Sequence, residues 1–350
     1  MQKVLATLLA LLVTASSCQK EAVEGAQDPA ISRTRLPYES PTIRVRIAST
    51  SVPSQTTDLH FFNETTGVAL TQDGKIYGSA DRGNTWALRY STAAANQPLH
   101  QLLFIDQRRG YAVGGNSGCL GSGCTPPGGL LLQTTDGGNT WTSAYEEKKG
   151  DFISVAVNSS GTLFLATNGP HARILRRTQT GATWSVVDST TNQVSTLVFN
   201  DRAGFYTGSG ARIIRSDDNG STWTHQTSLS YNFVNDLAFS QHVGYYLLGY
   251  SELYRTMDNG NTWQQARNPL AAVYKLTALT PTSCLLWGAG PSSGRDFPVV
   301  RGAVGQTQDG GTTWTGVEFE GIDLIRVASF YTPQQGYAVA GNTLLQVTVK

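Results

Sequence analysis

Aspartates that recur at one place in a repeated turn are the residues whose type and spacing could do chemistry in this chain. The pattern Ser/Thr-x-Asp-x-Gly-x-Thr-Trp occurs five times, with its acidic position at Asp81, Asp136, Asp218, Asp258 and Asp309. Carboxylates can act as general acids or bases, and glycosidases generally need two of them across one cleft. Catalytic groups converge on one place, whereas a repeated residue is spread over the structure. We therefore interpret the five aspartates as structural and expect no catalytic residue among them.

A tryptophan closes every copy of the pattern. A sixth, eroded copy runs over residues 177–184, with Gln179 at the acidic position. Successive tryptophans stand 39 to 55 residues apart, and a period of roughly 40–50 residues indicates a repeat architecture. The six tryptophans are Trp86, Trp141, Trp184, Trp223, Trp263 and Trp314.

The elements that position these residues are expected to be β-hairpins. Each copy follows a short apolar run and ends on Thr-Trp, which favours a pleated, half-buried surface. The glycine can supply positive φ, and the aspartate can accept hydrogen bonds from backbone N–H groups of the turn. A hydrogen bond to a charged group stabilises by about 1.5–3 kcal/mol. The tryptophan adds apolar area beside the turn, and its indole N–H needs a partner.

These residues resemble the Asp-box, or BNR repeat, which occurs in sialidases, sortilin-type receptors, xyloglucanases and the photosystem II stability/assembly factor family. Residues 110–114 (Gly-Tyr-Ala-Val-Gly) and 336–341 are similar to the repeat of the last family. The resemblance implies a seven-bladed β-propeller whose boxes join the third and fourth strands of each blade, away from any active site. It also implies a scaffold for membrane-protein assembly without known catalytic residues.

A second repeated element allows the blades to be counted. Phenylalanine followed five or six positions later by glycine precedes most boxes, as at Phe61 and Gly67, and predicts the hairpin of first and second strands. Seven units result, starting near residues 58, 101, 152, 195, 235, 276 and 325. The seventh lacks a box, so the alternating segment 42–48 is predicted to supply its outer strand and close the ring. Six blades with an appended hairpin are the alternative.

The first 40 residues predict export and anchoring. Residues 1–17 have a basic start, a short apolar core and small residues, as a secretory signal does. With Cys18 directly after them, they look like a bacterial lipoprotein signal, in which Cys18 would carry lipid. Cleavage nearby, with Cys18 a stray thiol, is the alternative. Residues 18–40 are polar and predict a flexible tether, and 41–350 the propeller. We expect a membrane-anchored lipoprotein of the cell envelope, on its periplasmic or surface face.

The other cysteines fit an exported chain. Cys119 and Cys124 bracket a Gly/Ser loop and are expected to form a disulfide in an oxidising compartment. A metal site is the alternative, although no histidine or acid is close in sequence. Cys284 lies in an apolar run and is expected to be a buried core thiol.

Charge and composition exclude several partners. The net charge is +1 and falls to 0 when residues 1–17 with Lys3 are removed, which argues against nucleic acid. No cofactor and no metal are expected, because the histidines are scattered and no phosphate-binding glycine loop is visible. We expect a monomeric domain with a protein partner, held to the membrane by its N-terminal lipid.

Two enlarged connections between second and third strands, residues 116–129 and 291–302, mark the face opposite the boxes. Long loops on a rigid scaffold often carry function. The candidate partner residues on this face are His171, Arg295, Asp296, Phe297 and Arg301. The alternative is that the loops are tolerated insertions. Arginines one residue before a box, at 176, 215 and 255, are interpreted as satisfied strand ends or as a basic band.

Three functions fit the sequence. The leading hypothesis is a non-catalytic, lipid-anchored propeller that binds a protein, as photosystem II assembly factors do. The second is a sialidase-like propeller that binds or cleaves glycans, although no tyrosine–glutamate pair or carboxylate spacing for it emerges. The third is a structural component of the envelope.

Overall fold

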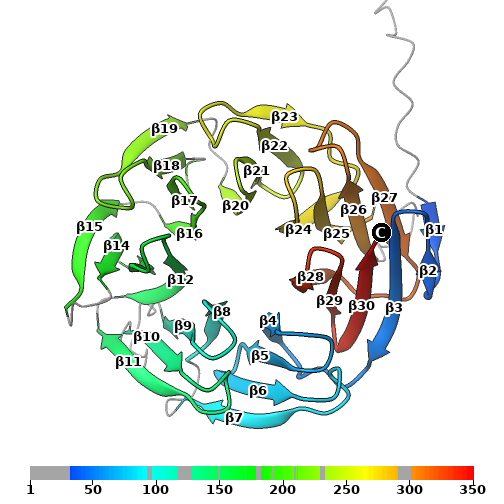
Figure 1. Cartoon of the computed structure of the whole chain (residues 1–350), viewed down its shortest axis with the longest axis horizontal. Coiled ribbons are helices and arrows are strands. Elements are labelled where there is room, and N and C mark those ends of the chain that lie inside the picture. Colours follow the sequence, from blue (N-terminus) through cyan, green and yellow to red (C-terminus); the bar gives the residue numbers. More distant parts are fainter. Residues whose placement is uncertain are drawn as a thin grey trace, which may run out of the picture.

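The molecule is a ring of seven antiparallel β-sheets around a central axis (Figure 1). This computed structural model describes residues 32–92, 97–116, 128–148, 150–169, 171–178, 183–190, 193–208, 210, 212–228, 233–290 and 301–350. The predicted seven-bladed β-propeller is confirmed, and the six-bladed alternative is wrong. No helix in these ranges is long and apolar enough to cross a membrane.

Each blade runs from an innermost first strand to a fourth strand at the rim, and the strands follow one another along the chain. Blades one to three comprise β4 (Thr56–Phe61), β5 (Gly67–Thr71), β6 (Lys75–Ser79), β7 (Ala87–Ser91); β8 (Leu99–Phe104), β9 (Gly110–Asn116), β10 (Gly128–Thr134), β11 (Thr142–Glu147); and β12 (Asp151–Val157), β13 (Leu163–Asn168), β14 (Ala172–Arg177), β15 (Ser185–Thr190). Blades four to six comprise β16 (Val194–Phe199), β17 (Gly204–Gly208), β18 (Arg212–Ser216), β19 (Thr224–Ser228); β20 (Val234–Ser240), β21 (Val243–Leu248), β22 (Glu252–Thr256), β23 (Gln264–Ala266); and β24 (Ala272–Ala278), β25 (Cys284–Ala289), β26 (Gly302–Thr307), β27 (Thr315–Phe319).

The seventh blade joins the two ends of the chain. It comprises β28 (Ile325–Thr332), β29 (Gln335–Ala340), β30 (Thr343–Val349) and, as its fourth strand, β3 (Ile43–Ser49) from the N-terminal side. β3 pairs antiparallel with β30, with Val45 opposite Val347. The predicted closing strand is therefore confirmed. β3 covers the outer edge of β30, which would otherwise be an unpaired sheet edge.

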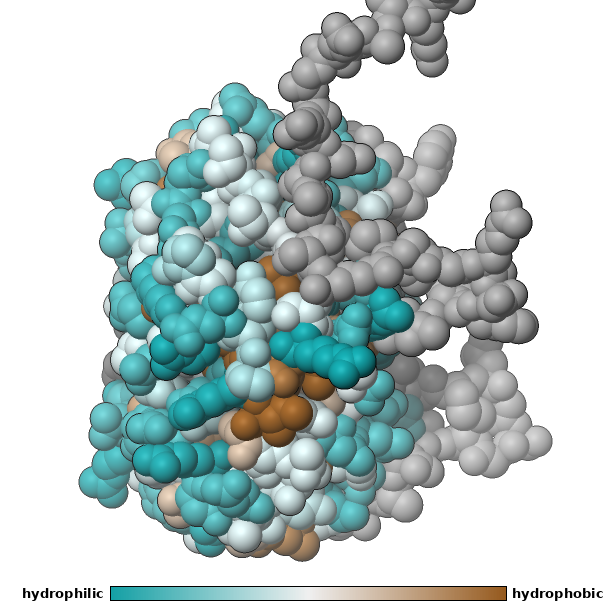
Figure 2. Space-filling model, turned by 90° about the vertical axis from the view of Figure 1, so that its right-hand side faces the viewer, coloured by the Kyte–Doolittle hydropathy of each residue, from teal (hydrophilic) through white to brown (hydrophobic). Residues whose placement is uncertain are grey.

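An N-terminal strap, residues 32–42, ties blade six to blade seven. β1 (Ser32–Thr34) pairs parallel with β27 of blade six, and β2 (Tyr38–Glu39) pairs with β3. Tyr38 also packs edge-on against Phe319, with ring centroids 6.1 Å apart. Figure 2 looks onto this side of the ring, which is mostly hydrophilic around one compact hydrophobic area.

The strap corrects the expected boundary of the tether. We predicted a flexible segment over residues 18–40, but from Ser32 onward the chain is paired with the ring. The polar composition of this segment did not reveal its pairing. Short edge strands are held by backbone hydrogen bonds, and any residue other than proline can supply both the donor and the acceptor.

The core lies between the blades, so second strands are apolar on both faces. β5, β17, β21 and β25 are buried at every position, whereas the rim strand β7 is exposed at four of its five. Neighbouring blades cover both sides of a second strand, and each pair of blades encloses one apolar cluster, such as Val68, Leu102 and Leu130. Continuous rather than alternating burial follows from this stacking.

The repeated Phe/Gly element forms the hairpin of first and second strands, as predicted. Phe104 stands opposite Gly110 in the register of β8 and β9, and its ring covers that glycine. A Cβ on Gly110 would lie 2.5 Å from the ring, so only glycine fits under the phenylalanine.

Candidate functional site

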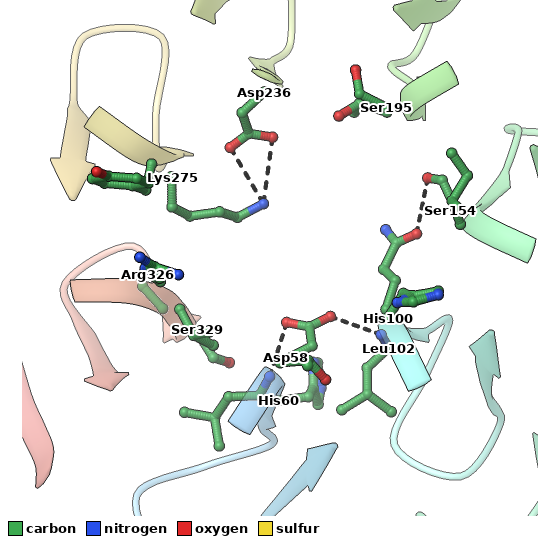
Figure 3. A pocket seen from close by; sticks show the side chains of 18 of the residues that line it. Asp58, His60, His100, Leu102, Ser154, Ser195, Asp236, Lys275, Arg326 and Ser329 are labelled. Atoms are coloured by element: carbon green, nitrogen blue, oxygen red, sulfur yellow. Dashed lines mark hydrogen bonds and ion pairs between the residues drawn. The ribbon is translucent and has the colours of Figure 1, made fainter. Parts of the chain in front are cut away.

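The central channel holds a polar cavity of about 470 Å³ lined by the first strands of all seven blades (Figure 3). Each first strand has a register shift at the same place near its start, which marks a β-bulge. A bulge adds one residue and re-aims side chains, and bulges often lie beside functional sites. The bulged residues are Thr57, His100, Ile153, Ser195, Asn235, Tyr274 and Arg326.

Polar side chains in the channel bind the backbone of the next blade. Leu102 donates its N–H to Asp58 at 2.7 Å, and Leu276 donates its N–H to Asp236 at 2.8 Å. We call the recurring set the channel belt. Its five bonds run from Leu102 N to Asp58, Val155 N to Gln101, Leu197 N to Ser154, Leu276 N to Asp236 and Phe61 N to Ser329.

Two carboxylates and one ammonium group face one another across the cavity (Figure 3). Lys275 Nζ lies 3.4 Å from Asp236 Oδ2, and attraction to that carboxylate raises the pKa of Lys275. Burial raises the pKa of Asp58, while its bond from Leu102 and the charge of Lys275 act in the opposite direction. Both carboxylates accept backbone N–H groups, and Asp236 is also paired with Lys275.

The two histidines that line the channel also contact neighbouring side chains. His60 packs between the rings of Phe62 and Phe104, at centroid distances of 4.8 and 4.7 Å. Burial lowers the pKa of His60 to about 4, so the imidazole is neutral at pH 7. His100 Nε2 lies 2.9 Å from Asp151 Oδ2, whose residue is only 6% exposed. In the described residues no group of three or more His, Cys, Asp or Glu side chains could hold a metal ion.

The box aspartates lie between third and fourth strands on one face, which we call the box face. Asp136 accepts the Thr134 hydroxyl at 2.8 Å, the Thr140 N–H at 2.9 Å and the Thr140 hydroxyl at 2.7 Å. The Thr140 bonds hold the pKa of Asp136 down, at about 2. Equivalent bonds recur at Asp81, Asp218, Asp258 and Asp309. The five carboxylates are spread around the ring, and none lines the channel cavity.

The box tryptophans differ in their hydrogen bonds. Trp86, Trp141 and Trp314 donate to the carbonyl of their own box glycine at 3.0, 3.0 and 3.2 Å. The indole nitrogens of Trp223 and Trp263 are buried without a partner in the described residues, contrary to our expectation that each would find one. Trp184, in the eroded copy, packs against Tyr145 and under Arg177 instead. Gln179 lies outside the described residues.

The three arginines before boxes each reach the box of the following blade. Arg176 donates to Ser221, Arg215 to Asn261 at 2.6 Å, and Arg255 to the carbonyl of Gly310 at 3.0 Å. Arg215 is only 6% exposed and also pairs with Asp217. The strand-end interpretation therefore holds at these positions, and the arginines link blades.

The opposite face, which we call the loop face, carries the second-to-third connections and the links between blades. His171 is exposed there. Arg301 instead donates a hydrogen bond of 2.9 Å to Glu318, and Glu318 is only 1% exposed. Arg295, Asp296 and Phe297 lie outside the described residues, as do Cys18, Cys119 and Cys124. Cys284 is buried, as predicted.

Sequence reasoning missed the channel. Its signal is a polar residue directly before an apolar one near the start of the first strand, as in Asp58-Leu59, Gln101-Leu102 and Asp236-Leu237. In a single strand this is ordinary alternation, and only superposing the seven units would have singled it out.

No protein-family model and no curated protein matches the chain. Among solved structures, a YCF48 bound to D1 peptide has a TM-score of 0.66 at 18% identity, covering 91% of this chain and 100% of that one. YCF48 from Cyanidioschyzon merolae has a TM-score of 0.60 at 15% identity, covering 87% and 98%. A GH74 xyloglucanase from Xanthomonas campestris has a TM-score of 0.64 at 12% identity, and the match covers 86% of this chain and 53% of the enzyme. At these identities the likeness shows the propeller fold alone.

Proposed function

We propose that this chain is a non-catalytic, lipid-anchored propeller that binds a protein partner of the cell envelope on its loop face. The partner contributes a segment that lies over the mouth of the channel. The chain then acts as a scaffold and performs no reaction on the segment.

The observation that carries this proposal is the engagement of the channel's acidic groups. Asp58 and Asp236 accept backbone N–H groups of the next blade at 2.7 and 2.8 Å. Glycoside hydrolysis needs one carboxyl group free to donate a proton and another free to attack or activate water. A carboxylate that holds two blades together cannot move into that role without loosening the ring.

A peptide partner is supported by the similar YCF48 structure, which holds a D1 peptide. The GH74 xyloglucanase has the same fold, and the chain spans only about half of its length, 53%. Much of that enzyme therefore lies outside the shared part. The similarity to the YCF48 that holds a peptide extends over the whole of that chain and supports a peptide partner.

Anchoring through Cys18 would place the ring beside a membrane. The first residue paired with the ring is Ser32, so residues 18–31 would separate the lipid from the strap. A segment of this length reaches at most about 45 Å when fully extended, at ~3.3 Å per residue. Replacing Cys18 with serine should release the chain from the membrane fraction, and retention of the variant there would contradict anchoring by this residue.

Site-specific photo-cross-linking tests which face binds. A photoreactive amino acid at Ser251, exposed on the loop face, is compared with one at Asp201, exposed on the box face. We expect a discrete protein cross-link from Ser251 in intact envelopes and none from Asp201. Cross-links from Asp201 alone would reject the loop face. Release of sugars from xyloglucan or sialylated glycans by the purified chain would reject a non-catalytic role.

A further inference from the structure

A row of three aromatic side chains and one arginine crosses the loop face from blade five to blade seven. Phe233 and Tyr250 are 41% and 46% exposed, two of six large hydrophobic side chains so exposed in the described residues. Their ring centroids lie 5.9 Å apart, and the ring of Tyr250 is 4.9 Å from that of Tyr274, the bulged residue of β24. Arg326 Cζ is 5.1 Å from the centroid of Tyr274. We call these four residues the aromatic row.

The row is held on rigid backbone. Gly249 donates its N–H to the carbonyl of Phe233 at 2.9 Å, and Val273 donates its N–H to the carbonyl of Tyr250 at 2.7 Å. These bonds link the start of β20, the turn after β21 and the start of β24. Backbone held in this way does not have to be ordered when a partner binds, and adjoining exposed apolar side chains mark interaction sites.

A positive charge ends the row. Arg326 is exposed, and within the described residues its guanidinium lies against the ring of Tyr274 and forms no ion pair. Asp323 lines the adjoining groove without pairing with it. Lys275, one residue from Tyr274, is already paired with Asp236. A carboxylate arriving at this end of the row could form a bidentate, charge-assisted bond with Arg326.

The orientation of the rings favours side chains over sugars. Phe233 and Tyr250 are nearly perpendicular, at 84°, and Tyr250 and Tyr274 are tilted by 41°. Arg326 covers part of the Tyr274 face. A glycan chain would need successive ring faces open and roughly parallel, whereas edges and tilted faces suit aliphatic or aromatic side chains. The length of the row corresponds to about four or five residues of extended peptide at ~3.3 Å each.

We propose that the aromatic row binds an extended peptide segment with two apolar side chains followed within about three residues by an aspartate or glutamate. The apolar side chains pack on Phe233, Tyr250 and Tyr274, and the carboxylate pairs with Arg326. This rests on the proposed function, which gives the loop face a protein partner, and adds the chemistry of the bound segment.

The test begins with a display library of random peptides of about seven residues, selected on the mature chain. An enriched peptide is then synthesised with its acid as Glu or as Gln, and both forms are titrated by fluorescence polarisation. We expect the double variant F233S/Y250S to weaken both forms by about tenfold or more. R326Q should weaken the Glu form by about tenfold and leave the Gln form unchanged.

Matched controls are Leu88→Ser and Val186→Ser, since both side chains are 54% exposed on outer strands. We expect them to bind peptide as the wild type does. If F233S/Y250S binds the peptide as tightly as the wild type does and keeps its thermal midpoint, the aromatic row is not the binding site. The proposal of a peptide-binding propeller would still stand. If no peptide is enriched, and the wild type binds a glycan on an array whereas F233S/Y250S does not, the row binds a glycan and the proposed peptide ligand is wrong. Absence of any cross-link from Ser251 would instead reject the loop face itself.

Discussion

Asp58 in blade one accepts the backbone N–H of Leu102 in blade two at 2.7 Å. The bond joins the innermost strands of two blades, where the chain passes closest to the axis. Each member of the channel belt lies on a first strand, and four of the five follow a bulged residue directly. The bulges therefore direct polar side chains sideways, toward the next blade. The channel carboxylates Asp58 and Asp236 thereby join neighbouring blades.

Replacing Asp58 with alanine should destabilise the ring. The carboxylate accepts the N–H groups of both Leu59 and Leu102. Leaving partly buried donors without an acceptor costs about 1–3 kcal/mol each, so we expect a loss of about 3 kcal/mol. Urea unfolding followed by tryptophan fluorescence measures it. Asp58→Asn, which keeps an acceptor oxygen, should lose clearly less, and equal losses would contradict the role of the belt.

The same pair of variants gives a pH dependence. Burial raises the pKa of Asp58 in the folded chain, so the folded state favours the protonated form. Ionisation then costs stability as pH rises through the unfolded value of about 3.9 toward the raised folded value. The amide introduced by Asp58→Asn cannot ionise, so the stability of this variant relative to wild type should increase over that range. A difference independent of pH from 3 to 7 would show that the carboxyl group is not perturbed.

The box aspartates should behave in the opposite way. Because its Thr140 bonds lower the pKa of Asp136 to about 2, this carboxylate stabilises the fold fully above about pH 4. The contribution is lost as pH falls toward 2. Asp136→Ala should cost about 2 kcal/mol at pH 6 and progressively less on acidification. Asp201→Ala, at an exposed turn on the same face, is the control and should cost little. A loss at Asp136 that stays constant down to pH 2.5 would contradict the bonding.

Much of this fold was predictable because the same local interactions recur in seven units of the chain. Apolar second strands, Phe/Gly hairpins and box turns each leave a local signature, and β3 was predicted from its alternation in Ile43, Val45 and Ile47. The channel was harder, since Asp236 looks like any polar residue of a strand until the neighbouring Leu276 is placed beside it.

The aromatic row and the strap were not predictable for a different reason. Phe233, Tyr250 and Tyr274 come from a blade link, a turn and a bulge of the consecutive blades five and six, and only the packing of these two blades brings the rings together. Tyr38 contacts Phe319 only once the chain has come full circle. Contacts between distant segments with no repeated pattern leave no trace in a single sequence.

Truncation tests the strap. Removing residues up to 31 leaves every described contact, whereas removal through Pro41 deletes β1, β2 and the ion pair of Arg35 with Glu320. We expect the first truncation to keep the thermal midpoint and the second to lower it, because the outer edge of β27 is then unpaired. Hydrogen exchange should accelerate in residues 315–319. Unchanged exchange there would mean that the strap adds nothing to blade six.

Cys284 provides a probe of the intact ring. Its side chain is fully buried, and burial raises the pKa of the thiol, so it should resist thiol reagents until the blade opens. In a variant with serine at the other three cysteines, labelling should follow global unfolding in urea. Ser251→Cys, exposed on the loop face, should label at once and serves as control.

The four cysteines together test the predicted disulfide. If Cys18 carries lipid and Cys119 is bonded to Cys124, the denatured mature chain takes up one label without reductant, at Cys284, and three after reduction. The mass of each peptide assigns the labelled positions. Three labels before reduction would show that Cys119 and Cys124 are free thiols, and the loop between them would then lack a covalent constraint.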